Sequence, residues 1–376
     1  MKIDLITETA AFARLEPEWR ALESAPGLLG LFHGYTWQFE WWKALGGARS
    51  LRLLVARNGG RTVGLLPLYE ERREGIKRLA LIGSPGGGSD YLEALCVDDG
   101  IRRALIEAAA GLGADLIELE DLLSTSPFLP AVLDHARVTH RFAECVPRFP
   151  CPFIPVNRSF REYQETLARR ENLRRRAKWF SAQPGFRIVR ESSPEATGPF
   201  LDRFFRLHAA RWREDGGSQA FSDARLVAFH RAVTARLAEE GRLQLWTLWV
   251  AGEAVAVAYA FEDRGRSLYY QSGFLPAWGA RSAGLVLFAA YVEDAFNRGL
   301  QEIDLLRGDE PYKSEWTRER RATVAVRWAL TASGRAALAW RQARARARQV
   351  ALAALPQTTR AALSRVVRER RMSEAA

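Results

Sequence analysis

Residues Ser267 to Trp316 read SLYYQSGFLPAWGARSAGLVLFAAYVEDAFNRGLQEIDLLRGDEPYKSEW, and this stretch decides the fold. The pattern predicts a strand, a turn of small residues, a long helix over about 282–298, a second strand and an acidic turn with one lysine. The first N–H groups of a helix lack intrahelical partners, and the helix dipole favours an anion there. The stretch therefore predicts a site for a phosphate-bearing ligand beside a candidate catalytic turn.

The same order of elements is predicted twice in the chain. Each half reads as a three-strand meander, then a helix, then a strand, and the Pro-rich stretch Pro147–Pro155 separates the halves. A repeated order at this scale indicates two domains of one type. The expected strands are 51–56, 62–69, 76–82 and 116–119 in the first half, and 243–250, 255–261, 267–273, 302–306 and 323–330 in the second.

Composition limits the class of protein. The chain has 376 residues, of which 48% are hydrophobic and 26% charged, as in soluble globular proteins. It has no apolar run near the ~20 residues of a membrane-spanning helix and no signal-peptide pattern at its start. Three cysteines without CxxC spacing and five histidines without HExxH argue against a disulfide framework and a metal site. We therefore expect a cytoplasmic protein without a metal.

The net charge of +11 is concentrated in two segments. Arg169–Lys178 carries +5, and the C-terminal segment from Ala332 carries +8, so the rest of the chain is slightly acidic. Basic patches attract anionic substrates, nucleic acid or anionic lipid. The C-terminal segment reads as a basic helical or flexible tail, and one expected partner is an anionic membrane surface.

The order of elements and several motifs together resemble one family. The motifs YTWQFEWWKALG, GSPGGGSDYLEALCV, FFRLHAARWRE and YQSGFLPAWGARSAG are similar to those of the CelD/BcsL-type (BioF2-like) acetyltransferases. That family has tandem GNAT-like domains and is related to the FemAB peptidyltransferases. The resemblance implies an α/β (α+β) fold with two mixed sheets flanked by helices, in domains 1–150 and 151–331, followed by the tail 332–376.

The resemblance also implies an acyl donor, acetyl-CoA or another acyl-CoA. Its phosphates are expected at the turn after the strand, where small residues allow backbone N–H groups to approach and Ser282 caps the helix. The end of the preceding strand is expected to bind the pantetheine arm. Alternation along that strand puts Tyr269 and Gln271 on one face and Tyr270 and Ser272 on the other. The candidate donor-binding residues are Gln271, Ser272, Arg281, Ser282, Ala283 and Gly284.

Two residues of the turn Arg307–Lys313 are the catalytic candidates. Lys313 is one of few lysines in an arginine-rich chain, and a lysine in this position in the FemAB relatives suggests that it stabilises an oxyanion. Asp309 is the candidate general base, with Glu310 as an alternative. Capping, or pairing with Arg307, is the competing explanation for both carboxylates.

The acceptor is expected to be a small molecule, such as an amino sugar or glycan precursor, bound between the domains. The loop Gly83–Tyr91 lacks the Gly-Lys-Ser/Thr ending of a P-loop, so we expect a flexible wall of the acceptor site. His208 and Arg211, spaced i,i+3, could hold an anionic or sugar acceptor. The candidate acceptor-binding residues are Asp90, Tyr91, His208, Arg211, Tyr312 and Trp316.

Three functions fit this pattern. The first is an N- or O-acyltransferase in exopolysaccharide or cellulose biosynthesis. The second is a FemAB-like transferase that uses aminoacyl-tRNA, which the basic run supports and the lack of a long helical hairpin opposes. The third is a non-catalytic partner in a polysaccharide assembly. A DNA partner is not expected.

Overall fold

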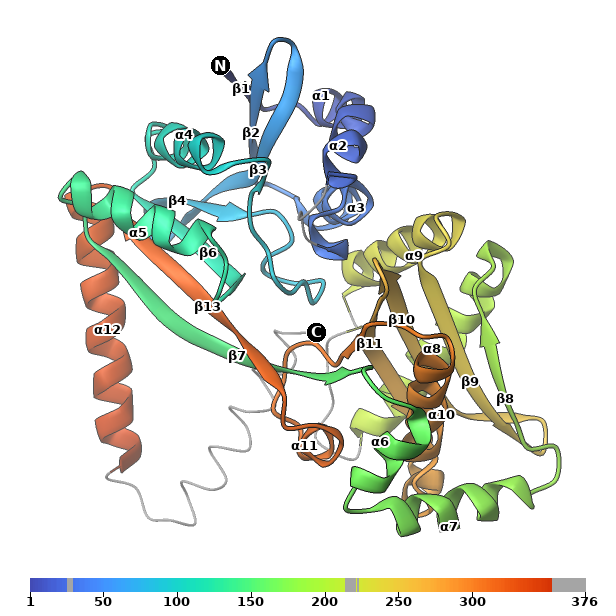
Figure 1. Ribbon diagram of the computed structural model, residues 1–376. Helices are drawn as coiled ribbons and strands as arrows, with labels where there is room; N and C mark the ends of the chain where they lie inside the picture. Colours follow the sequence, from blue (N-terminus) through green and yellow to red (C-terminus); the bar gives the residue numbers. More distant parts are fainter. Residues whose placement is uncertain (26–29, 214–220, 222, 354–376) are drawn as a thin grey trace. The chain divides into compact units, whose positions relative to one another are not determined.

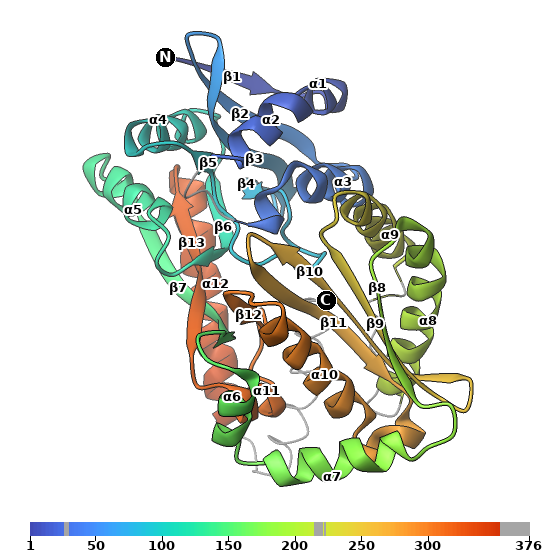
Figure 2. The ribbon, with the colours of Figure 1, turned by 45° about the vertical axis from the view of Figure 1, so that its right-hand side comes forward.

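The computed structural model describes residues 1–25, 30–213, 221 and 223–353, apart from the side chains of 211–213 and 353. The chain forms two compact units: unit 1 comprises residues 1–148 and 322–376, and unit 2 comprises residues 149–321. Unit 2 is thus an insertion in the sequence of unit 1. Figures 1 and 2 show mixed sheets flanked by helices, which confirms the predicted fold class.

The sheet of unit 1 has the strand order β1-β2-β3-β4-β6-β13-β7. Its first four strands form an antiparallel meander, β4 pairs with β6 in parallel, and β6 pairs with β13 antiparallel. The strands are β1 (Lys2–Ile6), β2 (Ser50–Asn58), β3 (Arg61–Arg73), β4 (Ile76–Leu81), β6 (Leu116–Leu123), β13 (Arg320–Ala329) and β7 (Ala143–Pro155), with β5 (Leu95–Cys96) beside β3.

Strand β13 of unit 1 follows the residues of unit 2 in the sequence. The expected division of the chain put residues 323–330 in the C-terminal domain. The structure instead pairs β13 with β6, from Thr323 opposite Leu123 to Ala329 opposite Leu116. The pattern of apolar residues predicted this strand, but its pairing partner lies far away in sequence. Local sequence cannot identify such a partner.

Helices of unit 1 precede, connect or follow its strands. The crossover from β4 to β6 runs through α4, which packs against β2 and β3. The helices are α1 (Thr9–Arg14), α2 (Glu16–Glu23), α3 (Tyr35–Leu45), α4 (Asp99–Ala110), α5 (Phe128–Val138) and α12 (Ala332–Ala353), with the short turn η1 (Leu31–His33). The aromatic residues of α3 are core residues, since Trp37 and Trp41 are fully buried.

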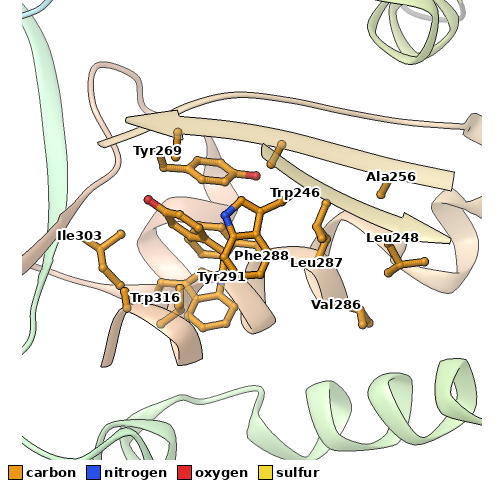
Figure 3. Packing of buried hydrophobic residues seen from close by; sticks show 14 of the residues in the cluster. Trp246, Leu248, Ala256, Tyr269, Val286, Leu287, Phe288, Tyr291, Ile303 and Trp316 are labelled. Atoms are coloured by element: carbon orange, nitrogen blue, oxygen red, sulfur yellow. The ribbon is translucent and has the colours of Figure 1, made fainter. Parts of the chain in front are cut away.

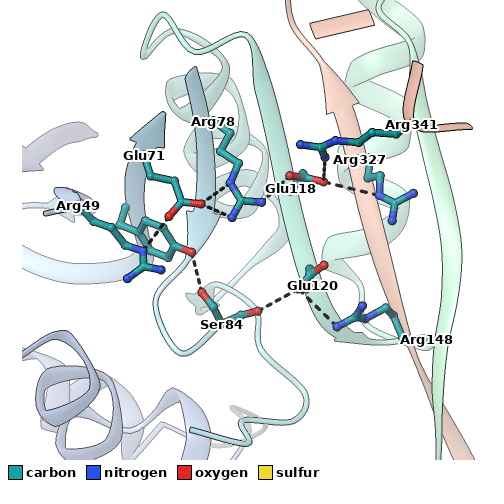
Figure 4. A network of polar contacts seen from close by, with 10 residues as sticks. Arg49, Glu71, Arg78, Ser84, Glu118, Glu120, Arg148, Arg327 and Arg341 are labelled. Atoms are coloured by element: carbon teal, nitrogen blue, oxygen red, sulfur yellow. Dashed lines mark hydrogen bonds and ion pairs between the residues drawn. The ribbon is translucent and has the colours of Figure 1, made fainter. Parts of the chain in front are cut away.

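A polar network holds the sheet of unit 1 to α12 (Figure 4). The Arg78 guanidinium is buried and donates to Glu118 over 2.6 Å, and Arg341 of α12 donates to the same carboxylate over 2.7 Å. These cations hold the pKa of the Glu118 carboxyl below its usual value, although burial alone would raise it. A charged carboxylate therefore links β4, β6 and α12.

Unit 2 repeats the architecture. Its strand order is β7-β12-β11-β10-β9-β8, antiparallel except for the parallel pair β11–β12. The strands are β8 (Arg187–Glu191), β9 (Leu243–Val250), β10 (Glu253–Asp263), β11 (Arg266–Phe274) and β12 (Glu302–Asp304). The helices are α6 (Phe160–Thr166), α7 (Arg170–Ser181), α8 (Pro194–Arg213), α9 (Ala224–Glu239), α10 (Ala283–Asn297) and α11 (Pro311–Trp316), with the turn η2 (Pro276–Arg281).

Opposite faces of this sheet carry different cores. On one face α10 packs with α6 and α7, and Trp246, Tyr269, Phe288 and Tyr291 interlock between the sheet and α10 (Figure 3). On the other face α8 and α9 cover the sheet with an aromatic cluster that includes Tyr259. Both cores fix the position of β11, the strand that leads into the candidate site.

Candidate functional site

The candidate site begins where β11 and β12 separate. The two strands pair in parallel only from Arg266 opposite Glu302 to Leu268 opposite Asp304, where β12 ends. β11 continues to Phe274, and along this extension its other edge stays paired with β10. Beyond Leu268, the edge of β11 that had paired with β12 therefore continues without β12 beside it. An edge of this kind can bind an extended ligand through main-chain hydrogen bonds.

A β-bulge in β11 reverses the side-chain alternation predicted from sequence. The register places Tyr269 opposite Ala260 but Gln271 opposite Tyr259, so Tyr270 is the extra residue. Residues opposite one another share a face of a sheet. Tyr269 and Ser272 therefore face α10, whereas Tyr270 and Gln271 face α8 and α9. The predicted pairs were wrong, because a bulge inserts one residue into the alternation.

Gln271 and Ser272 lie in the continuing part of β11. Both side chains are half-buried, and neither makes a side-chain hydrogen bond within the described part of the chain. They therefore offer polar groups to a ligand from opposite faces of the same strand.

The N-terminus of α10 directly follows this strand. Ser282 does not cap the helix as predicted: its backbone is left-handed (φ 63°), and its side chain makes no cap hydrogen bond. The first intrahelical bond runs from Val286 N–H to Ser282 O, so the amides of residues 283–285 lack helical partners. The first turn carries no acidic residue. This helix end is suited to an anion.

Two arginines flank the same turn. Arg176 of α7 donates from Nη1 to Ala280 O over 3.0 Å, while its buried Nε has no hydrogen-bond partner. The Arg281 guanidinium lies 4.5 Å from the centroid of the Trp179 ring. Neither arginine forms an ion pair within the described residues. Two unneutralised cations beside a helix N-terminus match the charge of a phosphate or pyrophosphate.

Glycines of the turn serve packing. A Cβ at Gly284 would lie 3.3 Å from the Phe274 ring, and one at Gly279 would lie 3.4 Å from it. The ring of Phe274 thus packs against both η2 and the start of α10. The sequence predicted small residues here for access to a ligand, and the structure adds this packing requirement.

The corresponding crossover in unit 1 has a different helix start. The Asp98 side chain accepts from Ile101 N–H at 2.8 Å and caps α4, and Asp99 adds a second carboxylate in the first turn. These negative charges disfavour an anion there. Of the two crossover helices, only α10 is therefore suited to hold phosphates.

The glycine-rich loop Gly83–Tyr91 of unit 1 is firmly anchored. Three buried aromatic residues donate to it: Trp37 to Ser89 Oγ at 2.8 Å, Trp41 to Gly86 O at 2.9 Å and Tyr69 to Ser84 O at 2.8 Å. These bonds correct the expectation of a flexible wall. The candidate acceptor contacts Asp90 and Tyr91 are both buried, at 0% and 9% exposure, and both belong to unit 1.

Lys313 is buried inside the turn that carries it. Its Nζ lies 2.7 Å from Arg307 O, 3.4 Å from Leu306 O and 2.9 Å from the Glu310 carboxylate. The two carbonyl oxygens accept hydrogen bonds from the ammonium, and the ion pair with Glu310 neutralises its charge. Stabilising an oxyanion would compete with these contacts. These contacts suit a lysine at this position, since a guanidinium is larger and planar.

The other candidates of this turn have different environments. Asp309 is exposed and has no partner within the described residues. Tyr312 is half-buried, with its ring 6.0 Å from that of Phe288. Trp316 packs in the core, 5% exposed and 4.8 Å from the Phe288 ring, and its contact with an acceptor stays a prediction.

His208 belongs to α8, on the opposite face of the sheet, and is part of the aromatic cluster there. It is 6% exposed, and its ring lies 4.8 Å from that of Phe221. The side chain of Arg211, its expected neighbour, lies outside the described residues. The structure therefore separates His208 from the turn before α10, which packs on the other face.

Sequence reasoning missed a buried pair beside His208. His230 Nδ1 and Tyr259 Oη lie 2.9 Å apart, and both residues are fully buried. Burial lowers the pKa of His230 to about 3, with a smaller contribution from His208, and raises the pKa of Tyr259. His230 is therefore neutral near pH 7. The apolar spacing of α9 signalled a buried face, but nothing in the sequence identified Tyr259 as the partner.

Among known families, the model described as acetyltransferase (GNAT) domain matches residues 168–314, which lie inside unit 2. The sequence has no match among curated proteins. Residues 168–314 are therefore similar to a GNAT-type acetyltransferase domain, and the part of the chain that forms the candidate phosphate site is the part that carries the match.

Solved structures agree with this fold. FemX is 11% identical over 86% of this chain and 97% of its own, with a TM-score of 0.58. L-PGS from Bacillus licheniformis is 12% identical over 82% of this chain and 90% of its own, with a TM-score of 0.53. A conserved protein of unknown function from Bacteroides thetaiotaomicron is 10% identical over 87% and 100%, with a TM-score of 0.51. At these identities the likeness concerns the fold alone.

Proposed function

We propose that this protein is an acyltransferase that moves an acyl group from acetyl-CoA or another acyl-CoA to an amine or hydroxyl of a small acceptor. The observation that carries the proposal is the continuing edge of β11 leading into the acid-free N-terminus of α10. A pantetheine arm is extended and bears amides, whereas a pyrophosphate is a compact anion. The first suits a strand edge, and the second suits a helix start.

The residues present fit such a donor. The amides of residues 283–285 would hold the pyrophosphate, with Arg281 and Arg176 supplying positive charge. The orphaned Nε of Arg176 supports an anion at this position, because a buried donor without a partner is costly. Main-chain groups of β11 beyond Leu268, together with Gln271 and Ser272, would contact the arm.

In the proposed reaction, a lone pair of the acceptor attacks the thioester carbonyl, the C–S bond breaks, and the thiolate leaves. The acceptor must lose a proton during the attack, and the exposed carboxylate of Asp309 is the proposed base. Lys313 then acts as a positioning residue, because it ties Leu306, Arg307 and Glu310 into the turn that presents Asp309.

The finer identity is also part of the proposal. The proposed acceptor is an amino sugar or glycan precursor, and the proposed role is that of a CelD/BcsL-type enzyme in the cytoplasm. The predicted acceptor contacts stay predictions: Asp90, Tyr91, His208, Arg211, Tyr312 and Trp316. The proposed partners are this acceptor and, for the basic C-terminal segment, an anionic membrane surface. DNA and metal ions have no role in it.

Calorimetry with acetyl-CoA tests the donor assignment. We expect binding in the micromolar to millimolar range, about 10-fold weaker for Arg176→Gln, since a charged hydrogen bond contributes about 1.5–3 kcal/mol. Arg175→Gln is the matched control, because Arg175 is exposed on the same helix and, among the residues that the structure describes, bonds only to Asn172. Absence of binding at millimolar acetyl-CoA would rule the proposal out, and equal losses in both variants would reject the assigned position.

The competing donor is an aminoacyl-tRNA. It is favoured by the exposed basic side chains of α7, namely Arg170, Arg174 and Lys178, which are spaced by four residues and so share a face. Binding of charged tRNA should then fall steeply with salt and with Arg170→Gln/Arg174→Gln, while Arg176→Gln has little effect. Tight tRNA binding without acyl-CoA binding would select this alternative.

A further inference from the structure

Helix α12 has two distinct faces. One face docks on unit 1: Leu338 is 1% exposed, Arg341 donates to Glu118 over 2.7 Å, and Gln342 donates to Glu144 over 2.6 Å. Gly334 lies so close to Asp115 that a Cβ on it would clash with the backbone carbonyl oxygen of Asp115. These contacts fix the rotation of the helix about its axis, and so fix which side chains point away from unit 1.

The opposite face is an exposed apolar stripe. Its members follow one another at intervals of four, three, four and three residues, which keeps them on one side of the helix. Trp340 is 62% exposed and Val350 is 70% exposed, and the alanines between them are exposed too. The stripe consists of Ala336, Trp340, Ala343, Ala347 and Val350. No helix of the described residues is both long and apolar enough to cross a membrane.

Arginines border the stripe on both sides. Arg344 and Arg348 follow Trp340 at successive intervals of four residues, whereas Arg346 lies three residues after Ala343 and four before Val350. All three are exposed, and residues 332–353 contain five arginines and no Asp or Glu. The free part of the helix therefore combines an apolar stripe with positive charge that nothing on the helix neutralises.

An apolar stripe bordered by positive charge favours one kind of binding partner over others. A second copy of α12 would bring the same positive charge, so self-association is electrostatically opposed. Nucleic acid would use the arginines and could stack a base on Trp340, but alanine and valine cannot stack on bases, so four of the five stripe residues would make no base contact. An anionic bilayer surface uses both features: apolar side chains and Trp enter the interface, and arginines reach the headgroups.

We propose that the exposed face of α12 binds anionic lipid surfaces, with Trp340 and Val350 in the interface and Arg344, Arg346 and Arg348 on the headgroups. This surface belongs to unit 1 and is independent of the donor assignment in unit 2.

The test is co-sedimentation of the full chain with vesicles of phosphatidylcholine alone and of phosphatidylcholine with about one-third phosphatidylglycerol. We expect binding only to the anionic vesicles, weakened by high salt. Arg344→Gln/Arg346→Gln/Arg348→Gln should weaken binding roughly 10²-fold, from ~1 kcal/mol per basic residue, and Trp340→Ala should weaken it several-fold. The matched control Arg61→Gln/Arg72→Gln/Arg73→Gln removes the same charge from exposed hairpins of unit 1 and should change binding much less.

Three results would overturn the proposal. The first is equal effects of the α12 variant and its control, which would mean that only net charge matters. The second is a dimer in solution that Trp340→Ala dissociates, which would show that the stripe is a dimer interface. The third is binding to RNA that is tighter than binding to the anionic vesicles.

Discussion

Replacing Lys313 by methionine separates the two roles that this lysine can have. Methionine keeps the length of the chain but removes the ammonium, and with it the contacts to two carbonyl oxygens and to the Glu310 carboxylate. Each buried acceptor left without a donor costs about 1 kcal/mol or more. Glu310 is 35% exposed on its side chain and can turn to water, so we expect a total loss of about 2–3 kcal/mol.

The assay is thermal unfolding combined with turnover. At ~2–4 °C per kcal/mol for a unit of this size, Tm should fall by roughly 4–12 °C. The control Lys77→Met removes a partly exposed ion pair with Glu70 and should cost less than about 1 kcal/mol. Lys313→Arg should also destabilise, because the larger guanidinium must fit the same space. An unchanged Tm with kcat reduced 10²- to 10³-fold would refute the positioning role and show that Lys313 stabilises the oxyanion.

Three further predictions test other parts of the structure. The pKa of His230 is about 3 in the folded protein and about 6.5 in the unfolded chain, so the unfolded chain binds more protons below pH 6.5, and the free energy of unfolding should fall by about 2 kcal/mol at pH 5. Urea titrations at several pH values should show that His230→Asn loses this pH dependence, whereas the exposed control His140→Asn keeps it. An unchanged pH dependence in His230→Asn would contradict the assignment. Gly273→Ala should destabilise unit 2 by about 1–2 kcal/mol, because the added Cβ would lie 3.0 Å from His208 N. The control Gly198→Ala lies on an open helix surface and should not destabilise unit 2. Equal melting temperatures of the two variants would refute the contact. A chain ending after Arg321 lacks all but two residues of β13 and the whole of α12, so residues 1–148 should be digested rapidly by protease, whereas a chain ending after Ala353 should resist. Protection of the shorter chain would show that β13 and α12 are both dispensable for unit 1.

Sequence patterns predicted most elements but not their long-range pairing. The hairpin at Asn58–Gly60 and the crossover through α10 depend on turn chemistry and helical periodicity, and both were predicted close to their observed bounds. The pairing of β13 with β6 depends on residues about 200 positions apart, for which no local signal exists.

The candidate site stays a proposal, and the sequence indicated its turn without its detailed geometry. The turn before α10 was identified from small residues next to an arginine. The left-handed backbone of Ser282 and the bulge at Tyr270 were missed, because both are set by packing and register. The interior position of Lys313 was also missed, since a single lysine in a polar turn reads as exposed. Arg176 lay within a basic run, and only the structure distinguishes it from its exposed neighbours.

The insertion of unit 2 within unit 1 sets an order of events during synthesis. The ribosome releases residues 149–321 before β13, so unit 2 has its whole sequence available while the sheet of unit 1 still lacks a central strand. Until residue 329 emerges, the edge of β6 that β13 covers is open to other strands. The nascent chain therefore carries an unpaired, apolar strand edge for more than half of its synthesis, which makes this edge the expected target of chaperones and the expected origin of misfolding.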